Sequence, residues 1–586
     1  MCEKIGSING AILTLVGMSS SKSENVLTVE KVDKTLRNLE KNENNVRQMA
    51  ENGRLLPLLT LLNEGPPETK LSMASYLGEL ALSKDIKVFV ATTVGSSLIN
   101  LMKSGNIKSK EPALKALNQV SSCESSAKIL VDQGILSPLV KDLFAGHMQL
   151  KEMSATILAN IVTSDSDFSS ISVGPNHQTL VSEDIIHNLL YLISTGPAIK
   201  CKLLQVLVGL TSSPVTLTSV VSAIKSSGTI DSLVQFIEAP QQDLRMTSIK
   251  LLQNLSPNMS QELASSLRGT PSLLSSLIKV IMENITCTEE QAAAVGLLAD
   301  LSERDIGLTR QMLDGGAFEM VISRIRMVFQ GDQSRRSRFV TPYIEGLVRV
   351  LSRITFMLAD EPKAVSFCRD NDLAGLFVDL LQVNGLDNVQ MVSAFALENL
   401  SQQSKNLTKL PEMPIFHFFS KQPVMTVLLC RVHRGVCSQR DTFCLLEGAA
   451  LPRLVALLDH TNEKLIEASL AALATLLDDG VNIEGGVAVL CEVEGLKPIL
   501  DVLLEKQTDS LWRRAIWVVE RLLRTEDVVY EVSGDPNVST ALVQAFQHGD
   551  YQTSQISECA LKHIDKIPNF SNIFVDLLNA RNLQSR

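Results

Sequence analysis

The sequence predicts an all-α protein built as a right-handed α-solenoid of about 12 repeats. Three observations predict it. One phrase recurs along the chain at a nearly constant step, and a second phrase with the apolar spacing of a helix alternates with it. The composition agrees, because 45% of the 586 residues are hydrophobic but only 4% are aromatic. Such a chain is better explained by stacked aliphatic helices than by about four separate domains.

The first phrase is a short helical lead, a Gly-containing turn and an apolar run that reads as a helix. The steps from Gly10 to Gly53, Gly95 and Gly134 are 43, 42 and 39 residues. A period of about 40 to 47 residues is that of armadillo and HEAT repeats. The clear copies surround Gly53, Gly134, Gly228, Gly316, Gly448 and Gly495, and the weaker ones surround Gly10, Gly95 and Gly269.

The second phrase has apolar residues at i, i+3, i+4 and i+7, as a helix with one buried face requires. Small Ala, Ser and Gly recur inside these helices and would let neighbouring helices approach closely. The expected helices are 70–83, 150–164, 243–257, 290–303, 389–402 and 463–477.

Together the two phrases resemble the armadillo repeat, in which a second helix leads through a Gly turn into a third helix. The typical ending of that third helix is matched by LLQNLS (251–256), ILANIV (157–162) and ALENLS (396–401). The alternative, an unrelated helical bundle, does not easily account for a fixed order of turn and helix at a constant period.

Interruptions of the period predict three regions: an armadillo array over 1–400, a Pro-, Phe- and Cys-containing insertion over 401–440, and further repeats over 441–586. The step from Asp372 to Ala449 is 77 residues. The segment 410–424 between them is rich in Pro and Phe and reads as an ordered insertion. Residues 330–342 read as a loop, and the Ser-rich stretch 164–178 reads as a solvated connector.

Catalytic and cofactor motifs are absent from the sequence, so no catalytic, cofactor-binding or metal-ligating residue is predicted. A net charge of −10 and the few aromatic residues disfavour nucleic acid as a partner. The ten Cys residues are interpreted as reduced thiols of a cytoplasmic protein, because a chain of this length needs no disulfides to stabilise its core.

One dense group of metal-ligand residue types is CRVHRGVCSQRDTFC, which contains Cys430, His433, Cys437 and Cys444. Thiolates and an imidazole could bind zinc. The spacing fits no standard pair, however, and Cys437 and Cys444 read as one face of a helix. We therefore favour buried thiols that pack as small hydrophobic groups, with a zinc site as the alternative.

The segment from Val321 to Arg353 contains seven Arg residues but only two acidic residues, Asp332 and Glu345. One interpretation is a solvated helix face with a flexible loop. The other is an anion site centred on Arg335, Arg336 and Arg338 for acidic protein segments or an anionic membrane surface.

Asn160, Asn254 and Asn399 lie at matching places near the ends of third helices. A side-chain amide can donate to and accept from the backbone of an extended peptide, so these residues are candidates for a partner-binding groove. The alternative is that each caps its own helix. Nuclear-import carriers of this fold place Trp one turn before such an Asn, whereas this chain has Thr156, Lys250 and Phe395 there. Recognition of nuclear signals is therefore disfavoured.

Longer phrases, at 7–40, 43–82 and 430–455, resemble the C-terminal armadillo half of plant U-box ubiquitin ligases, specifically a large senescence-associated subgroup. The resemblance implies a solenoid that selects protein substrates or membrane partners, while a U-box recruits the ubiquitin-conjugating enzyme. No U-box is recognised in this chain, so the conjugating enzyme is not an expected partner of these residues.

The first residues, MCEKIGSINGAI, read as the end of a second helix entering its Gly turn, which predicts a first unit without its opening helices. Two functions are therefore expected from the sequence. The chain is the recognition part of a ubiquitin ligase, inactive by itself. Alternatively, it is a non-enzymatic scaffold or adaptor in the cytoplasm or at the plasma membrane.

Overall fold

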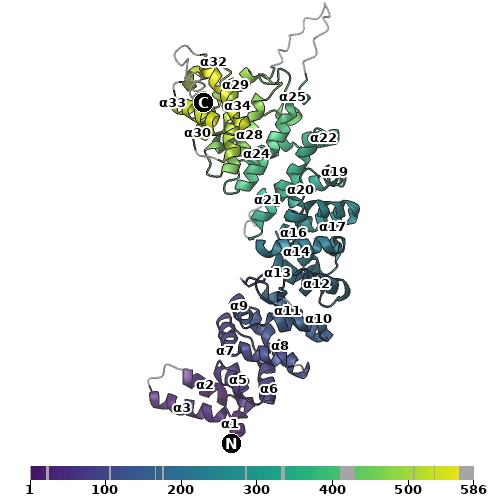
Figure 1. Ribbon diagram of the computed structural model, residues 1–586, viewed down its shortest axis with the longest axis vertical. Coiled ribbons are helices and arrows are strands. Elements are labelled where there is room, and N and C mark those ends of the chain that lie inside the picture. The colour runs from purple at the N-terminus through teal and green to yellow at the C-terminus, as the bar shows by residue number, and fades with distance from the viewer. Residues whose placement is uncertain are drawn as a thin grey trace, which may run out of the picture. The chain divides into compact units, whose positions relative to one another are not determined.

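The computed structural model describes residues 2–20, 25–104, 107–164, 166–174, 177–283, 287–330, 337–409, 429–505, 508–533 and 535–566 (Figure 1). These residues form two compact units, 1–269 and 270–586. Both units are helical. In the described ranges the β-type pairing consists of two isolated bridges, Ser172–Thr179 and Lys409–Val436. The prediction of an all-α fold is confirmed.

The helices of the first unit are α1 (Cys2–Gly6), α2 (Ala11–Ser20), α3 (Val26–Leu39), α4 (Glu43–Glu51), α5 (Leu56–Glu64), α6 (Pro67–Leu77), α7 (Lys84–Lys103), α8 (Ile107–Ser121), α9 (Glu124–Asp132), α10 (Leu136–Ala145), α11 (Met148–Ile161), α12 (Glu183–Thr195), α13 (Lys200–Thr211), α14 (Pro214–Ser227), α15 (Ile230–Val234), η2 (Gln235–Glu238) and α16 (Gln242–Gly269).

The helices of the second unit are α17 (Pro271–Met282), α18 (Glu289–Asp300), α19 (Ile306–Asp314), α20 (Ala317–Gln330), α21 (Val340–Ser352), η4 (Arg353–Met357), α22 (Pro362–Asp370), α23 (Leu373–Leu380), α24 (Asp387–Gln402), α25 (Ser404–Leu407), α26 (Gln439–Thr442), α27 (Ala450–Ala456), η5 (Leu457–Asp459), α28 (Glu463–Ala474), η6 (Thr475–Leu477), α29 (Ile483–Glu492), α30 (Leu496–Leu504), α31 (Asp509–Leu522), α32 (Glu526–Ser533), α33 (Pro536–His548) and α34 (Tyr551–Ile564).

The repeat formed by α4, α5 and α6 shows how local sequence sets the plan. The side chain of Asn42 accepts hydrogen bonds from the backbone N–H groups of Asn44 and Asn45 and so caps α4. Gly53 then turns the chain with φ of 91°, a conformation that a side chain disfavours. Gly65, with ψ of 169°, ends α5, and Pro66, with ψ of 157°, stands immediately before α6.

The Gly turn therefore joins the first and second helices of a repeat, not the second and third as the resemblance implied. This shift by one helix changes the interpretation of the start of the chain. Helices α1, α2 and α3 follow in the same order as α4, α5 and α6, with Gly10 in a left-handed turn between α1 and α2. The expectation that the first unit is truncated stays a prediction.

Left-handed turns occur at Gly10, Gly53, Gly134, Gly228, Gly316 and Gly448, whereas three other predicted turns differ. Gly95 lies inside the continuous helix α7. A Cβ at this position would lie 2.2 Å from Oε1 of Gln133, the residue that follows α9. Gly269 ends α16 without a left-handed backbone, and at Gly495 the left-handed residue is its neighbour Glu494.

The third helices of the repeats pack on one another in series within each unit. In the first unit α6 packs on α8, α8 on α11, α11 on α13 and α13 on α16. In the second unit the series is α18, α21, α24, α28, α31 and α34. The expectation that small residues permit close approach is met at Gly209, where a Cβ would lie 2.4 Å from Val162, and at Gly346, where it would lie 2.7 Å from Val295.

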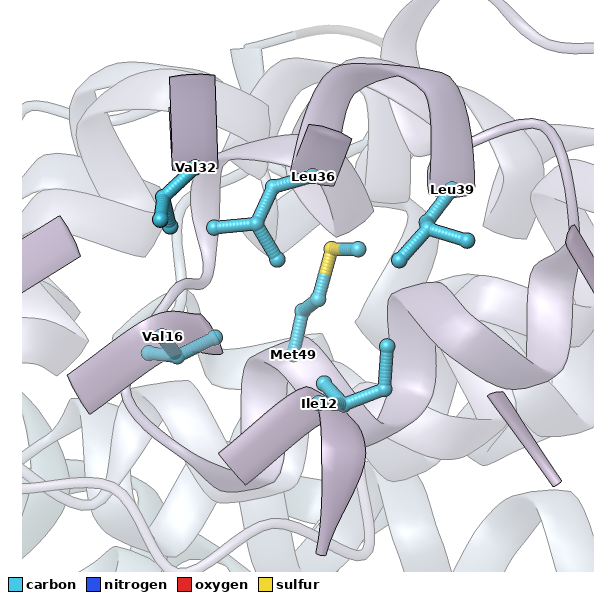
Figure 2. Packing of buried hydrophobic residues seen from close by; sticks show 6 residues of the cluster. All are labelled: Ile12, Val16, Val32, Leu36, Leu39 and Met49. Carbon is cyan, nitrogen blue, oxygen red and sulfur yellow. The ribbon is translucent and has the colours of Figure 1, made fainter. Parts of the chain in front are cut away.

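The core of the first repeat is apolar and is completed by Met49 of α4, the first helix of the next repeat (Figure 2). Met49, Leu36 of α3 and Ile12 of α2 have exposed fractions of 0%, 0% and 1%. Because the three side chains come from three different helices, no helix of this repeat buries its apolar face alone. Packing between elements therefore supplies most of the helix stability.

The predicted interruptions are only partly as expected. Between α11 and α12 the described residues form no α-helix, but Phe168 and Val173 are buried, so this connector is more than a solvated tether. Helix α21 already begins at Val340, inside the predicted loop 330–342. The Pro- and Phe-rich stretch 410–424 lies outside the described residues, and the boundaries at 400 and 440 stay a prediction. None of the described helices has the length and apolar character that crossing a bilayer requires.

Candidate partner-binding surface and thiol cluster

The three predicted groove residues, Asn160, Asn254 and Asn399, are half-buried and share one geometry. Each amide nitrogen donates to a hydroxyl oxygen on the preceding third helix or the turn after it: to Ser121 at 3.1 Å, Thr211 at 3.0 Å and Thr355 at 3.0 Å, respectively. These bonds join successive repeats, whereas a cap would bond within the same helix. The role in partner binding stays a prediction, and a partner N–H group would have to be met by the amide oxygen.

A hollow of about 860 Å³ opens beside Asn160 in the first unit. Its wall includes Gln205 of α13 and Lys250 of α16, the residue one turn before Asn254. Asp167 stands on the rim, where hydrogen bonds from the Ser169 side chain and backbone lower the pKa of its carboxyl group. The hollow thus combines side-chain amides with charges of both signs.

A second hollow, of about 470 Å³, crosses four successive third helices of the second unit: α24, α28, α31 and α34. Three carboxylates line it, from Glu398, Glu467 and Asp478, and Arg514 lies 3.6 Å from Glu398. Burial raises the pKa of both Glu398 and Asp478. These residues are far apart in sequence and were not singled out by the sequence analysis, although Glu398 adjoins Asn399.

Trp517 also lines this hollow, and the chain itself provides the cation that lies against the indole. The guanidinium carbon of Arg521 lies 4.9 Å from the centroid of the Trp517 ring, and Arg521 pairs with Asp479 at 2.7 Å. Arg521 follows Trp517 by four positions, the one-turn spacing at which import carriers place Trp and Asn. A peptide Lys would meet a position that Arg521 already occupies.

The Arg-rich segment is largely used within the second unit. Arg353 is fully buried, donates to the carbonyl oxygens of Leu301 at 2.9 Å and Ser302 at 2.7 Å, and has its pKa lowered by burial to about 10. Arg324 donates to Tyr343, and Tyr343 donates to the Ile281 carbonyl oxygen at 2.8 Å. These bonds satisfy carbonyl groups at the ends of α17 and α18.

Two further arginines of this segment bond to groups of the same unit: Arg326 to the Asn371 carbonyl oxygen at 3.2 Å, and Arg349 to Asp300 at 2.7 Å. Of the predicted anion patch, Arg335 and Arg336 lie outside the described residues. Arg338 is exposed, with its guanidinium carbon 4.6 Å from the centroid of the Phe339 ring. The anion patch therefore stays a prediction and would depend on three arginines rather than seven.

Cys430, His433, Cys437 and Cys444 are brought together before α27. Their ligand atoms all lie within 4.8 Å of one another. The expectation that Cys437 and Cys444 share a helix face is wrong, because α26 spans only Gln439–Thr442 and Phe443 turns the chain with φ of 59°. We call these four residues the thiol cluster.

Hydrogen bonding with Cys444 and with His433 lowers the pKa of the Cys430 thiol to about 3. The same bond to Cys430 raises the pKa of Cys444, and burial raises that of Cys437. The opposite shifts of Cys430 and Cys444 describe one shared proton rather than two independent groups. Cysteine binds metals as the thiolate, and a lowered thiol pKa makes the thiolate more abundant at neutral pH.

The fold is that of an armadillo-type protein, a class that presents extended surfaces to protein partners. A solved structure described as "A conserved phosphorylation switch controls the interaction between cadherin and beta-catenin in vitro and in vivo" covers 94% of this chain and 99% of its own, with a TM-score of 0.59 and 14% identity. At that identity the likeness concerns the fold alone.

Three relatives define the family. U-box domain-containing proteins 44 and 43 of Arabidopsis thaliana are 58% identical over 590 residues and 57% identical over 592 residues. U-box domain-containing protein 24 of Oryza sativa subsp. japonica is 49% identical over 604 residues. Each alignment covers 98% of this chain and 73% of the relative. No protein-family model matches. The chain belongs to the family of plant U-box domain-containing proteins, as its resemblance predicts.

Proposed function

We propose that this chain recognises protein substrates for U-box-type ubiquitin ligation, using the surface formed by its third helices. The observation that carries the proposal is the hollow across α24, α28, α31 and α34, which combines carboxylates, an arginine and the indole of Trp517. Family membership supports the ubiquitin pathway, and the fold supports a protein as the partner. Transfer of ubiquitin belongs to a U-box and to none of the described residues.

An extended peptide segment is the partner that this surface suits. The third helices α11, α16 and α24 each carry a side-chain amide at a matching position, and a peptide backbone offers donors and acceptors that such amides can bind. The three carboxylates of the second hollow outnumber its two guanidinium groups, those of Arg513 and Arg514, and therefore favour a segment that carries positive charge.

The test compares Glu467→Lys, a charge reversal inside the second hollow, with Asp501→Lys, the same reversal of an exposed residue of α30 outside it. Both changes are introduced into this chain, which is used as bait in proximity labelling. Partners whose labelling falls at least about tenfold with Glu467→Lys alone would support recognition in the hollow. Equal labelling by both variants and the unaltered protein would contradict it.

A second experiment examines catalysis. Purified ubiquitin-activating and ubiquitin-conjugating enzymes are combined with this chain, or with the same chain joined to a U-box. We expect ubiquitin chains only with the joined protein. Ubiquitin chains formed by the present chain alone would contradict the assignment of transfer to a U-box.

The alternative function is an adaptor without enzymatic activity, in the cytoplasm or at the plasma membrane. The exposed Arg338 of the predicted anion patch supports the membrane part of this alternative. Liposome flotation with anionic vesicles tests the membrane part. Loss of flotation when Arg335, Arg336 and Arg338 are all changed to Ala would support it. Equal behaviour of the two proteins would remove it.

A further inference from the structure

The thiol cluster has the distances of a metal site. His433 Nδ1 lies 3.5 Å from Cys430 Sγ, 3.4 Å from Cys437 Sγ and 3.5 Å from Cys444 Sγ, and the sulfur atoms of Cys430 and Cys444 are 3.9 Å apart. Tetrahedral zinc, with bonds of about 2.3 Å to sulfur and about 2.0–2.1 Å to nitrogen, separates sulfur from nitrogen by about 3.6 Å and sulfur from sulfur by about 3.8 Å. These four separations agree with the tetrahedral values within about 0.2 Å, and no two ligand atoms of the cluster are more than 4.8 Å apart.

Hydrogen bonds alone do not explain this arrangement. One imidazole nitrogen either donates one hydrogen bond or accepts one through its lone pair, yet three sulfur atoms converge on Nδ1 of His433. A cation between the four atoms would interact favourably with all of them at once. Thiolate and imidazole ligands are those that zinc prefers over calcium or magnesium.

The backbone around the cluster is fixed by turns. The N–H of Cys430 donates to the Gly435 carbonyl oxygen at 2.8 Å, and the N–H of Arg434 donates back to Cys430 at 2.9 Å. Arg434 itself has a left-handed φ of 57°. This tight loop directs Cys430 and His433 to the same side, with two residues between them.

Neighbouring groups support the sulfur atoms from outside the cluster. The His433 N–H lies 3.4 Å from Cys430 Sγ, and the Thr408 hydroxyl lies 3.2 Å from Cys437 Sγ. Asn482, which precedes α29, donates to the carbonyl oxygens of Val432 and Arg431, at 2.8 Å each. Outer hydrogen bonds of this kind orient metal ligands.

We propose that Cys430, His433, Cys437 and Cys444 bind one structural zinc ion. All four tetrahedral positions are taken by protein atoms, which is the arrangement of a structural rather than a catalytic site. Binding requires the three thiols to lose their protons, while the imidazole coordinates in its neutral form through Nδ1. The ion would close residues 430–444 into a single folded loop.

The position of the loop explains the need for such a tie. In the repeat of α4, α5 and α6, the first helix contributes Val46 and Met49 to the core. Between α24 and α27 the described residues form only two four-residue helices, α25 and α26. A metal ion can replace the apolar packing that a full first helix provides elsewhere.

The direct test is elemental analysis of the full chain, purified without an affinity tag, without chelators and under reducing conditions. We expect about one equivalent of zinc per chain. His433→Ala and Cys437→Ser should reduce this to less than about a tenth of an equivalent. Cys368→Ala is the matched control, because Cys368 is a buried thiol of α22 outside the cluster, and it should retain the full equivalent.

A second measurement avoids dependence on the folding of variants. The unaltered chain is stripped with a chelator and titrated with Co²⁺, which in a tetrahedral site with three thiolates gives visible d–d bands and sulfur-to-metal charge transfer. Zinc added afterwards should abolish these bands. Less than about a tenth of an equivalent of zinc in the purified chain, together with no cobalt spectrum from reduced thiols, would overturn the proposal. A Cys430–Cys444 disulfide found in the freshly purified chain would also overturn it.

Discussion

The core of the first repeat and the thiol cluster show two ways to complete a repeat. Around Met49 the side chains are aliphatic and come from three helices, so burial of apolar surface holds the helices together. Around His433 the helices are short, and the sulfur and imidazole atoms lie in a loop whose buried apolar side chains are fewer, among them Val432 and Phe443. The difference indicates that repeats need a filled interior but do not need the same chemistry to fill it.

The largest expected effect distinguishes the two cores directly. Met49→Ala removes a fully buried side chain and should lower the free energy of unfolding of the first unit by about 2–5 kcal/mol. Chelators should not change this loss, because none of the four residues of the thiol cluster lies in this core. Denaturant unfolding followed by hydrogen exchange in α2–α4 measures it. A loss below about 1 kcal/mol would mean that the core around Met49 is not tightly packed.

Close helix contact gives the next effect. Gly209→Ala places a Cβ 2.4 Å from Val162 and should cost about 1–3 kcal/mol through overpacking of α13 against α11. Gly17→Ala in α2 is the matched control, because nothing lies within 4 Å of its Cβ position, and it should be neutral or stabilising by up to about 1 kcal/mol. Equal effects of the two substitutions on the melting temperature would contradict the importance of close third-helix contact.

The polar surface of the second unit predicts a pH dependence. Burial raises the pKa of Glu398 above its ordinary value of 4.5. The folded state therefore binds this proton more tightly than the unfolded state does. The resulting stability is fully present below pH 4.5 and is lost as the pH rises through the folded pKa. Glu398→Gln should flatten this part of the profile when denaturation midpoints are compared between pH 7 and pH 4.5. An unchanged profile would contradict the burial of the charge.

The smallest effect concerns the hydrogen bonds between repeats. Asn399→Ala removes the bond to Thr355 and should cost about 0.5–1.5 kcal/mol of stability. If the side-chain amide also contacts a partner, the loss of partner binding will exceed this cost. Calorimetry of unfolding and a binding titration with a partner identified by proximity labelling separate the two. Equal losses in both measurements would assign Asn399 a purely structural role.

The fold could be predicted because the period and the apolar spacing are properties of the sequence alone. Single positions were less predictable. Gly95 resembles a turn glycine in sequence, but its role depends on Gln133 after α9, which only the packed structure reveals. Phe168 was assigned to a solvated connector because Ser residues surround it, although the fold buries its ring.

The sites could be predicted only in part, for two physical reasons. The members of the thiol cluster were evident from composition, but its geometry depends on left-handed residues at Arg434 and Phe443, which are not Gly and gave no turn signal. The second hollow combines Glu398, Glu467 and Arg514 from three repeats. Which side chains meet across repeats depends on helix register and rotamers, and the sequence alone determines neither.

The contact between Arg521 and Trp517 has a consequence for selectivity. A partner that places its own side chain on this indole must first displace the guanidinium and separate it from Asp479. Apolar side chains would leave Asp479 without its cation, whereas an arginine could take over both contacts. Binding here would therefore proceed as an exchange of one guanidinium for another. The incoming and outgoing guanidinium groups make the same two contacts, so the exchange itself contributes little to the binding free energy. The affinity then depends on the residues that flank the incoming arginine.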